Sequence, residues 1–366
     1  MKSYAVLEDG SCRTVEVPMP ELGPYEALVR IEACGVCNGT DSKLIHKTFK
    51  GFHQYPALLG HEAVGKVVRL GERVRHYKIG DRVLLPFGQD CEADGIRYAS
   101  GWGGFSQYGT VGDARAIQED GLGADSPHWS EGHFAQTVLP PDLGLSAADA
   151  TMIVTFREVL AAIRSFGMRP GCSVVIFGAG PVGLTFTRLL TLSGVTDTVV
   201  FDLAPEKAAR AVRFGAKRGY SSRETEPAAV VRSLYPGGVD FVLDAVGVSS
   251  LMNTAMELIA DHGKICCYGI SPKTDFALDW SKAPYNWQLQ FEQFPSKIQE
   301  GSVNEEILSW IREGRLRPAD FITARLPFRQ IDEAFRMIEE HRTDLKTVIL
   351  FEEDDVPSPL TTFSDQ

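Results

Sequence analysis

The sequence predicts an α/β protein of two parts, a β-rich barrel-like part and a doubly wound parallel sheet. Short alternating apolar runs separated by turn residues fill positions 1–110, which is typical of a β-barrel. From about position 146, strand-like and helix-like runs alternate, which is typical of a parallel sheet with helices on both faces. A chain of 366 residues is long enough for two domains.

The first part contains the clearest short strands. Alternating apolar runs occupy residues 27–32, 64–70 and 81–85, and glycine-containing turns separate them. A helix is expected from residue 146 to about residue 166.

The second part alternates regularly. Strands are expected at residues 173–177, 198–201, 240–243 and 264–268, and helices at about 181–193, 205–214, 226–235 and 249–260. After residue 295 we expect two amphipathic helices, at about 303–313 and 330–340, and a last strand at 346–351. The acidic, Pro- and Ser-rich tail that follows is expected to be disordered.

Composition argues against nucleic-acid and membrane partners. The formal net charge is −11, which disfavours binding to phosphate backbones and to anionic lipids. No apolar run reaches the roughly 18 residues that a membrane span needs, and the N-terminus has no apolar signal-peptide core. The seven cysteines are an odd number without framework spacing. We therefore expect a reduced, cytoplasmic protein.

A glycine motif follows the strand expected at 173–177. The stretch SVVIFGAGPVGL places Gly178, Gly180 and Gly183 in a G-x-G-x-x-G spacing between a strand and a helix. The first glycine permits the tight turn, the second lets the backbone approach a pyrophosphate, and the third lets helix and strand pack closely. Pro181 and Val182 open the helix whose N-terminus would hold the phosphates.

Asp202 predicts the choice of cofactor. It ends the next strand, where an acid accepts hydrogen bonds from the ribose hydroxyls of NAD and repels the 2′-phosphate of NADP. Lys207 lies nearby and is a further candidate contact to the cofactor. Its positive charge weakens the preference for NAD over NADP without reversing it. Val246 and Gly269 follow two later strands and are candidates for flanking the nicotinamide. The alternative is a glycine turn in an α/β domain that binds no dinucleotide.

The stretch ACGVCNGTDSK contains a C-x-x-C, formed by Cys34 and Cys37. A redox pair would normally accompany a thioredoxin-like βαβ pattern, and a structural zinc site would need two further ligands at close spacing. His61 and Glu62 lie downstream in GHEAVG, and imidazole and carboxylate are acceptable zinc ligands beside a thiolate. The pattern favours an open, catalytic zinc site that uses one of the two sulfurs.

Several stretches together resemble the zinc-type medium-chain dehydrogenases/reductases, of the alcohol, polyol and threonine dehydrogenase kind. They are GVCNGTD (35–41), GHEAVGKVV (60–68), GERVRHYKIGDRV (71–83), GGFSQY (103–108), GAGPVG (178–183) and ITARLPFRQIDEAF (322–335). The resemblance implies a GroES-like β-barrel catalytic domain, residues 1–150 and 295–366, split around a Rossmann NAD-binding domain, residues 151–294.

By resemblance, Cys37 and His61 are zinc ligands and Cys34 is a small buried side chain. The family's third ligand should fall near residues 153–154, but these are Ile and Val, so Glu62 and Glu158 are the candidates. One catalytic zinc and no structural zinc are expected, because the family's four-Cys loop is absent.

The expected activity is NAD-dependent interconversion of a secondary alcohol and its ketone, with zinc acting as a Lewis acid. The alcohol could be a polyol, a sugar or an amino-sugar-like compound. Thr40 would pass the hydroxyl proton outward, and Lys43, at the usual relay-histidine position, or His46 would continue the relay. The alternatives are a zinc-free reductase of activated double bonds and a non-enzymatic NAD-binding protein. Relatives pair sheet edges, so a homodimer or homotetramer is expected, with residues 288–291 as the edge strand.

Overall fold

The computed structural model describes residues 1–271, 273, 275–340 and 342–352, and it divides into two compact units. The first unit comprises Met1–Val154, Ser296–Arg312 and Arg317–Gln366. The second comprises Thr155–Pro295 and Glu313–Leu316. The acidic tail predicted to be disordered lies, from residue 353 onward, outside the described residues.

The first unit is built on two mixed sheets. One has the strand order β2 (Cys12–Glu16), β1 (Lys2–Val6), β4 (Ala57–Leu58), β8 (Ile96–Ser100) and β7 (Cys91–Ala93). The other has the order β16 (Ile322–Pro327), β17 (Lys346–Leu350), β3 (Glu26–Val36), β5 (Glu62–Leu70) and β6 (Arg82–Leu84), and β9 (Tyr108–Gly112) also pairs with β3. The β7–β8 hairpin was not predicted.

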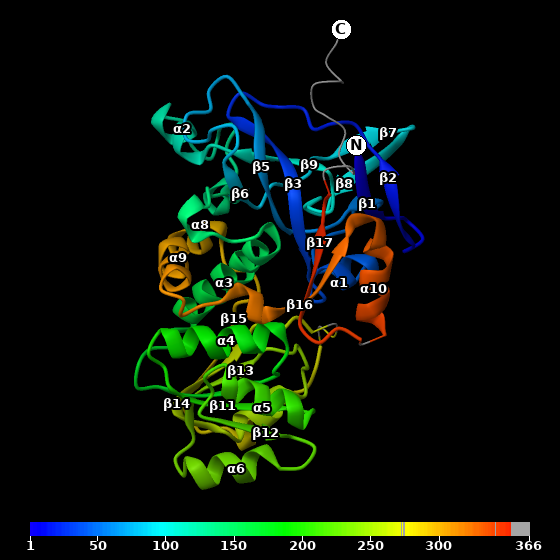
Figure 1. Cartoon of the computed structure of the whole chain (residues 1–366). Helices are drawn as coiled ribbons and strands as arrows, with labels where there is room; N and C mark the ends of the chain where they lie inside the picture. The colour runs from blue at the N-terminus through cyan, green and yellow to red at the C-terminus, as the bar shows by residue number, and fades with distance from the viewer. Residues whose placement is uncertain (272, 274, 341, 353–366) are drawn as a thin grey trace, which may run out of the picture. The chain divides into compact units, whose positions relative to one another are not determined.

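Strand β17 brings the far end of the chain beside its beginning. In Figure 1 the red β17 lies alongside the blue β3, and the two strands pair antiparallel with Val348 opposite Gly35. The intervening β3 also pairs antiparallel with β5, where Gly35 is opposite Glu62. Residues more than 280 positions apart in the sequence, such as Glu62 and Lys346, are therefore only two strands apart.

An apolar core joins this sheet to the last helix of the first unit. It includes Tyr4, Ile31, Cys34 and Phe105, together with Phe335 on α10 (Ile331–Glu339). The other helices of this unit are α1 (Asp41–Ile45), α2 (Ala114–Glu119), α8 (Lys297–Ser302) and α9 (Asn304–Arg312). Short 3-10 turns lie at η1 (Glu131–Ala135), η2 (Pro141–Leu143), η4 (Pro318–Phe321) and η5 (Phe328–Gln330). The helix expected at about 303–313 is α9, and the short helix α8 precedes it.

The second unit contains a six-stranded sheet in which every described strand pair is parallel. Its order is β12 (Arg218–Ser221), β11 (Asp197–Asp202), β10 (Ser173–Phe177), β13 (Val239–Asp244), β14 (Ile259–Cys267) and β15 (Trp287–Phe291). The helices of this unit are α4 (Pro181–Leu192), α5 (Pro205–Arg213) and α6 (Pro227–Leu234), which Figure 1 labels, and α7 (Leu251–Met256). A 3-10 turn, η3 (Trp280–Lys282), precedes β15, and α3 (Ala147–Phe166) runs across the division between the units.

The structure differs from the expectations at two places near this sheet. The helix expected at 249–260 ends at Met256, and β14 already begins at Ile259, because Ile259 is opposite Val239 in the sheet. Strand β12 was not predicted at all. Its sequence, RGYS, has little apolar character, and pairing with β11 decides its conformation.

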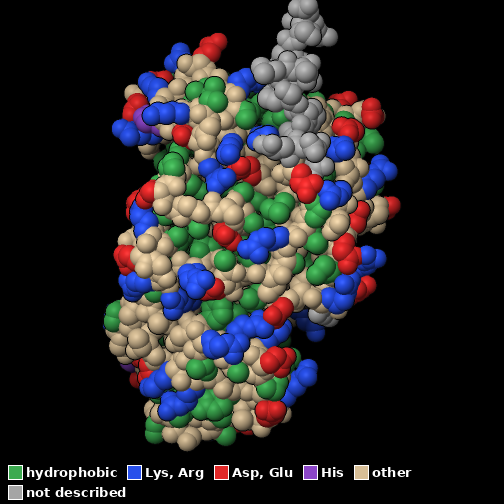
Figure 2. Space-filling view, viewed as in Figure 1, with side chains coloured by type: hydrophobic (Ala, Val, Ile, Leu, Met, Phe, Trp, Pro, Cys, Tyr) green, Lys and Arg blue, Asp and Glu red, His purple; other side chains and the backbone are tan. Residues whose placement is uncertain are grey.

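The surface is charged but mixed on the side that Figure 2 draws. There, side chains of Lys and Arg are interspersed with those of Asp and Glu and with apolar ones. The net charge of −11 is therefore not concentrated in a single acidic area of this face. None of the helices among the described residues combines the length and the hydropathy required to cross a bilayer.

Candidate functional site

Two adjacent strands bring three potential metal ligands together. Cys37 follows the end of β3, while His61 precedes β5 and Glu62 begins it. Since Gly35 on β3 pairs with Glu62 on β5, the end of one strand meets the start of the other. One ligand atom from each of Cys37, His61 and Glu62 lies within 4.8 Å of the others.

The donor set of this group fits zinc. A thiolate, an imidazole and a carboxylate are all ligands that zinc accepts, and three protein ligands are typical of catalytic zinc sites. His61 and Glu62 are buried and Cys37 is half-buried, so a metal would be largely enclosed but reachable from one side. Glu158, the other candidate for the third ligand, lies on α3 in the second unit.

Asp41, which was not predicted as a site residue, contacts two of the three candidate ligands, His61 and Cys37. Its carboxylate is fully buried; Oδ1 lies 3.6 Å from His61 Nδ1, and Oδ2 accepts a hydrogen bond of 2.9 Å from the backbone N–H of Cys37. Burial opposes a charge on His61, but the contacts to Asp41 and Cys37 outweigh this and raise the pKa of the imidazole. A metal must therefore compete with a proton at His61.

The proposed relay residues lie on and beside the helix that follows Cys37. Thr40 is buried, and its backbone N–H donates to the carbonyl of Cys37 at 3.2 Å. Lys43 is half-buried and donates to the carbonyl of Gly39 at 2.9 Å; burial lowers the pKa of its ammonium. His46 is exposed, and its Nδ1 lies 2.7 Å from the carbonyl of Ser42.

The Cys34 side chain points to the opposite face of β3 from the face on which Gly35 meets the side chain of Glu62. It is fully buried in the apolar core, as predicted, and burial raises the pKa of its thiol well above the ordinary value. A neutral, enclosed thiol of this kind is a poor metal ligand and a poor redox partner.

A buried cation completes the surroundings of Glu62. Lys346 on β17 is 5% exposed, and its Nζ donates to Glu62 Oε1 at 2.7 Å. Lys346 is the first residue of the strand expected at 346–351, and no role was predicted for it. A basic residue at the start of an apolar strand carries no local signal of a partner 284 positions earlier.

The glycine turn of the second unit has the geometry of a phosphate-binding turn. Gly178 has φ +103°, and Gly180 is the N-cap of α4, with Pro181 in the first turn. A Cβ on Gly183 would overlap the carbonyl oxygen of Gly178, so only glycine allows this approach. The free N–H groups at the start of α4 and the helix dipole make this end suitable for a pyrophosphate.

Asp202 supports the same turn. Its Oδ2 accepts from the backbone N–H of Ala179 at 2.8 Å, and its Oδ1 accepts from that of Ala204 at 2.9 Å. The carboxylate at the end of β11 is thus fixed beside the glycine turn. Lys207 lies in the first turn of α5 and is half-buried.

The remaining candidate cofactor contacts lie around the glycine turn. A Cβ on Gly178 would come within 2.6 Å of Val246 Cγ2. The loops after β13 and β14 also touch, since a Cβ on Gly269 would lie 2.5 Å from the carbonyl carbon of Val246. The structure therefore brings Gly178, Gly183, Val246 and Gly269 together at the carboxyl ends of the strands, where α/β sheets bind ligands.

Family models match both units. Residues 23–120 match the alcohol dehydrogenase GroES-like domain, and residues 181–291 match the model described as zinc-binding dehydrogenase. The matched segments contain Cys37, His61 and Glu62 in the first case and α4 to β15 in the second. The predicted fold class, a GroES-like barrel with a Rossmann-type parallel sheet, is confirmed.

Individual proteins resemble the chain over nearly its whole length. The (R,R)-butanediol dehydrogenase of Bacillus subtilis (strain 168) is 23% identical, over 92% of this chain and 96% of its own. The probable NADP-dependent isopropanol dehydrogenase of Mycoplasma pneumoniae is 26% identical, over 96% of this chain and 100% of its own. The solved structure of galactitol-1-phosphate dehydrogenase from Escherichia coli has a TM-score of 0.77 at 24% identity, covering 96% of this chain and 100% of that one.

Proposed function

The chain belongs to the zinc-containing medium-chain alcohol dehydrogenase family, and from that premise we propose that it interconverts a secondary alcohol and its ketone with NAD(H). The observation that carries this proposal is the group of Cys37, His61 and Glu62. These residues would hold a single zinc ion, and Glu158 remains the other candidate for its third protein ligand. When bound, zinc would act as a Lewis acid that lowers the pKa of the substrate hydroxyl.

Around this group, the chain's own residues would orient the ligands and move the proton. Asp41 keeps His61 and the backbone of Cys37 in place through its two carboxylate oxygens. Thr40 Oγ1 would accept the substrate proton while donating its own hydroxyl proton onward, and His46 or the neutral amine of Lys43 would take that proton and release it to solvent. A Lys at this position suits the relay because burial lowers the pKa of its ammonium.

The second unit would bind the dinucleotide. The pyrophosphate would lie at Gly178–Gly183, and Val246 and Gly269 would flank the nicotinamide. Asp202 supports NAD over NADP, since a carboxylate repels a 2′-phosphate. The name of one relative states NADP, so the cofactor has to be tested on this chain. We propose the catalytic and cofactor-binding domains with the boundaries given above, at residues 150/151 and 294/295.

The substrate is proposed only as a class. The named relatives act on butanediol, isopropanol and galactitol 1-phosphate, and all three are alcohols that can be oxidised at a carbon bearing a hydroxyl group. A secondary alcohol of polyol, sugar or amino-sugar-like type is compatible with this range.

A combined metal and turnover assay tests the proposal. Purified protein should contain about one zinc per chain by elemental analysis, and it should reduce NAD in the presence of some member of a panel of diols, polyols and amino-sugar alcohols. Removing the metal with a chelator should abolish turnover, and added zinc should restore it. Metal-free protein that reduces an activated double bond would instead support the zinc-free reductase class.

A further inference from the structure

We propose that Lys346 is a positioning residue that moderates the strength of Glu62 as a metal ligand. The inference rests on the proposed zinc site and adds to it a residue from the far end of the chain. It follows from three observations: the route by which the two side chains meet, their burial, and the charges that surround them.

The ion pair spans a third strand. Lys346 is on β17 and Glu62 on β5, with β3 between them, so the two backbones are roughly 10 Å apart. Their side chains can meet only by passing over β3. Val348 pairs with Gly35, and Gly35 pairs with Glu62, so by the two-residue period of strands Lys346 shares its face with both.

Gly35 provides the space for this crossing. A Cβ at this position would overlap Glu62 Oε2 and would lie 3.3 Å from Glu62 Cβ. Any side chain other than hydrogen would therefore displace the carboxylate from its present place. The glycine is required by side-chain space, since its backbone is part of a regular strand.

The pair is enclosed in a strongly anionic environment. The side chains of Lys346 and Glu62 are 5% and 2% exposed. Asp41 is fully buried nearby, where it contacts His61 and Cys37. A thiolate at Cys37 and the carboxylates of Asp41 and Glu62 sum to three negative charges around the candidate metal, and Lys346 reduces this to two.

This reduction has a definite consequence for metal affinity. A buried positive charge bound to one ligand carboxylate opposes a dication at the same group, since Coulomb energies are large where water is excluded. Lys346 thus makes Glu62 a weaker ligand than an isolated carboxylate would be. Removing the charge should strengthen zinc binding, whereas a purely structural Lys346 would weaken it when removed.

The experiment measures zinc affinity by competition with a chromophoric chelator, in the wild type and in Lys346→Gln, Lys346→Met and Lys346→Arg. The neutral variants should bind zinc at least about tenfold more tightly, as expected for loss of a nearby buried charge. Lys346→Arg, which retains the charge, should bind like the wild type. If Lys346→Met fails to fold, the Gln variant carries the test, since its amide can still donate to Glu62.

Two further variants test whether the space above Gly35 is needed and whether the effect depends on the position of the lysine. Gly35→Ala keeps both charges but displaces Glu62, so its zinc affinity should fall. Lys66→Gln is the matched control: Lys66 is also on β5, pairs with Glu32 at 3.3 Å and is half-exposed, and its removal should leave zinc affinity unchanged.

The outcomes are distinct. Unchanged or weaker zinc binding in folded Lys346→Gln overturns the inference, and so does unchanged binding in folded Gly35→Ala. A wild-type protein that binds no zinc would contradict the proposed function itself, and with it this inference.

Discussion

At the residue scale, Cys34 and Cys37 differ in burial and in their neighbours although they are three positions apart. Cys34 lies inside β3 with its side chain in the apolar core, whereas Cys37 follows the strand and lies beside His61 and Glu62. The Asp41 carboxylate accepts a hydrogen bond from the backbone N–H of Cys37. The C-x-x-C spacing is therefore incidental to the proposed chemistry.

We predict that Cys37→Ser removes bound zinc and turnover, because a thiolate ligand is replaced by a weakly coordinating hydroxyl. Cys34→Ser should keep its zinc and lose only about 1–2 kcal/mol of stability, the usual range for such a buried substitution. Elemental analysis and thermal denaturation of both variants check this. Full zinc occupancy in Cys37→Ser would exclude the proposed site.

Asp202 gives the residue-scale test of cofactor choice. We predict that the wild type binds NADH more tightly than NADPH and that Asp202→Ala narrows this preference by about tenfold, the scale of one lost charge–charge repulsion of about 1.4 kcal/mol. Asp202 also holds the N–H groups of Ala179 and Ala204, so the variant should bind both cofactors less well.

The ratio of the two dissociation constants therefore isolates the charge effect, and fluorescence titration with each cofactor measures it. Asp240→Ala is the control. The Asp240 carboxylate accepts hydrogen bonds from Ser173 at the start of β10, at the opposite end of this strand from the glycine turn. A wild type that prefers NADPH would show that the assignment to NAD is wrong.

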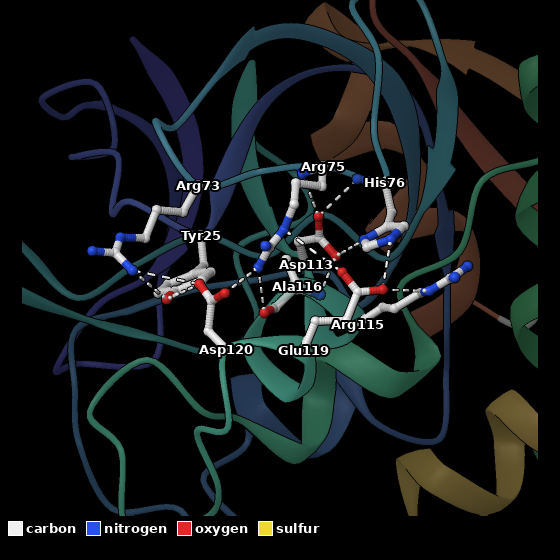
Figure 3. A network of polar contacts seen from close by, with 9 residues as sticks. All are labelled: Tyr25, Arg73, Arg75, His76, Asp113, Arg115, Ala116, Glu119 and Asp120. Atoms are coloured by element: carbon white, nitrogen blue, oxygen red, sulfur yellow. Dashed lines mark hydrogen bonds and ion pairs between the residues drawn. The ribbon is translucent and has the colours of Figure 1, made fainter.

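At the scale of elements, short α2 depends on one carboxylate. Asp113 is buried and accepts from the N–H of Ala116 as the N-cap of α2; it also accepts from the backbone N–H groups of Arg75 and His76 and contacts the His76 ring at 2.9 Å. Figure 3 shows how this carboxylate joins the loop after β5 to the helix. Arg75 also pairs with Asp120, and Asp120 accepts a 2.7 Å hydrogen bond from the hydroxyl of Tyr25.

The hydrogen bonds to Asp113 imply a pH-dependent stability. Burial alone would raise its pKa, but the bonds from Arg75, Ala116 and His76 outweigh burial and lower the pKa below the ordinary value. A group whose pKa is lowered by folding contributes stability above its unfolded pKa of about 3.9, and this contribution disappears as the pH falls through the folded pKa.

We predict that Asp113→Asn lowers the stability of the first unit by about 1–3 kcal/mol at pH 7, because the amide nitrogen meets backbone donors. The deficit should shrink as the pH falls below about 4, where the wild-type carboxyl loses the same contribution. Thermal denaturation between pH 7 and pH 3 measures it. Asp320→Asn, an exposed carboxylate 3.9 Å from Arg317, is the control and should cost little. A deficit that is the same at both pH values would contradict the argument.

At the scale of the whole molecule, β15 is the last strand on one side of the parallel sheet. An edge strand presents unpaired backbone groups to another chain. Phe291 at its end is 53% exposed, and Gln288 is exposed as well. These features support the proposal of a homodimer or homotetramer that pairs β15 with its copy.

We predict that light scattering at micromolar concentration gives the mass of a dimer or tetramer, and that the double substitution Gln288→Lys and Phe291→Lys gives a monomer. Like charges brought together at two copies of the same edge repel, which is the way natural edges avoid pairing. Val212→Lys, at an exposed position on α5, is the control and should leave the mass unchanged. A monomeric wild type would contradict the proposal.

The sequence by itself determined the order of the parts and most of the candidate groups. Apolar runs such as 173–177 became β10 without correction, and G-x-G-x-x-G placed its three glycines where a tight turn, a helix N-terminus and a close contact require them. These features are local, because each follows from a few neighbouring residues and their backbone preferences.

Only the tertiary structure decided the features that join distant segments. Strand β12 was not expected and forms because it pairs with β11, and β14 begins earlier than expected because it pairs with β13. In both cases the pairing outweighs the intrinsic propensity of a few residues. Cys37 and His61 meet because β3 and β5 are adjacent, and Lys346 reaches Glu62 because β17 lies on the other side of Gly35. No local pattern encodes a contact across 284 positions; the sheet register creates it, and burial then makes the charge of each partner matter.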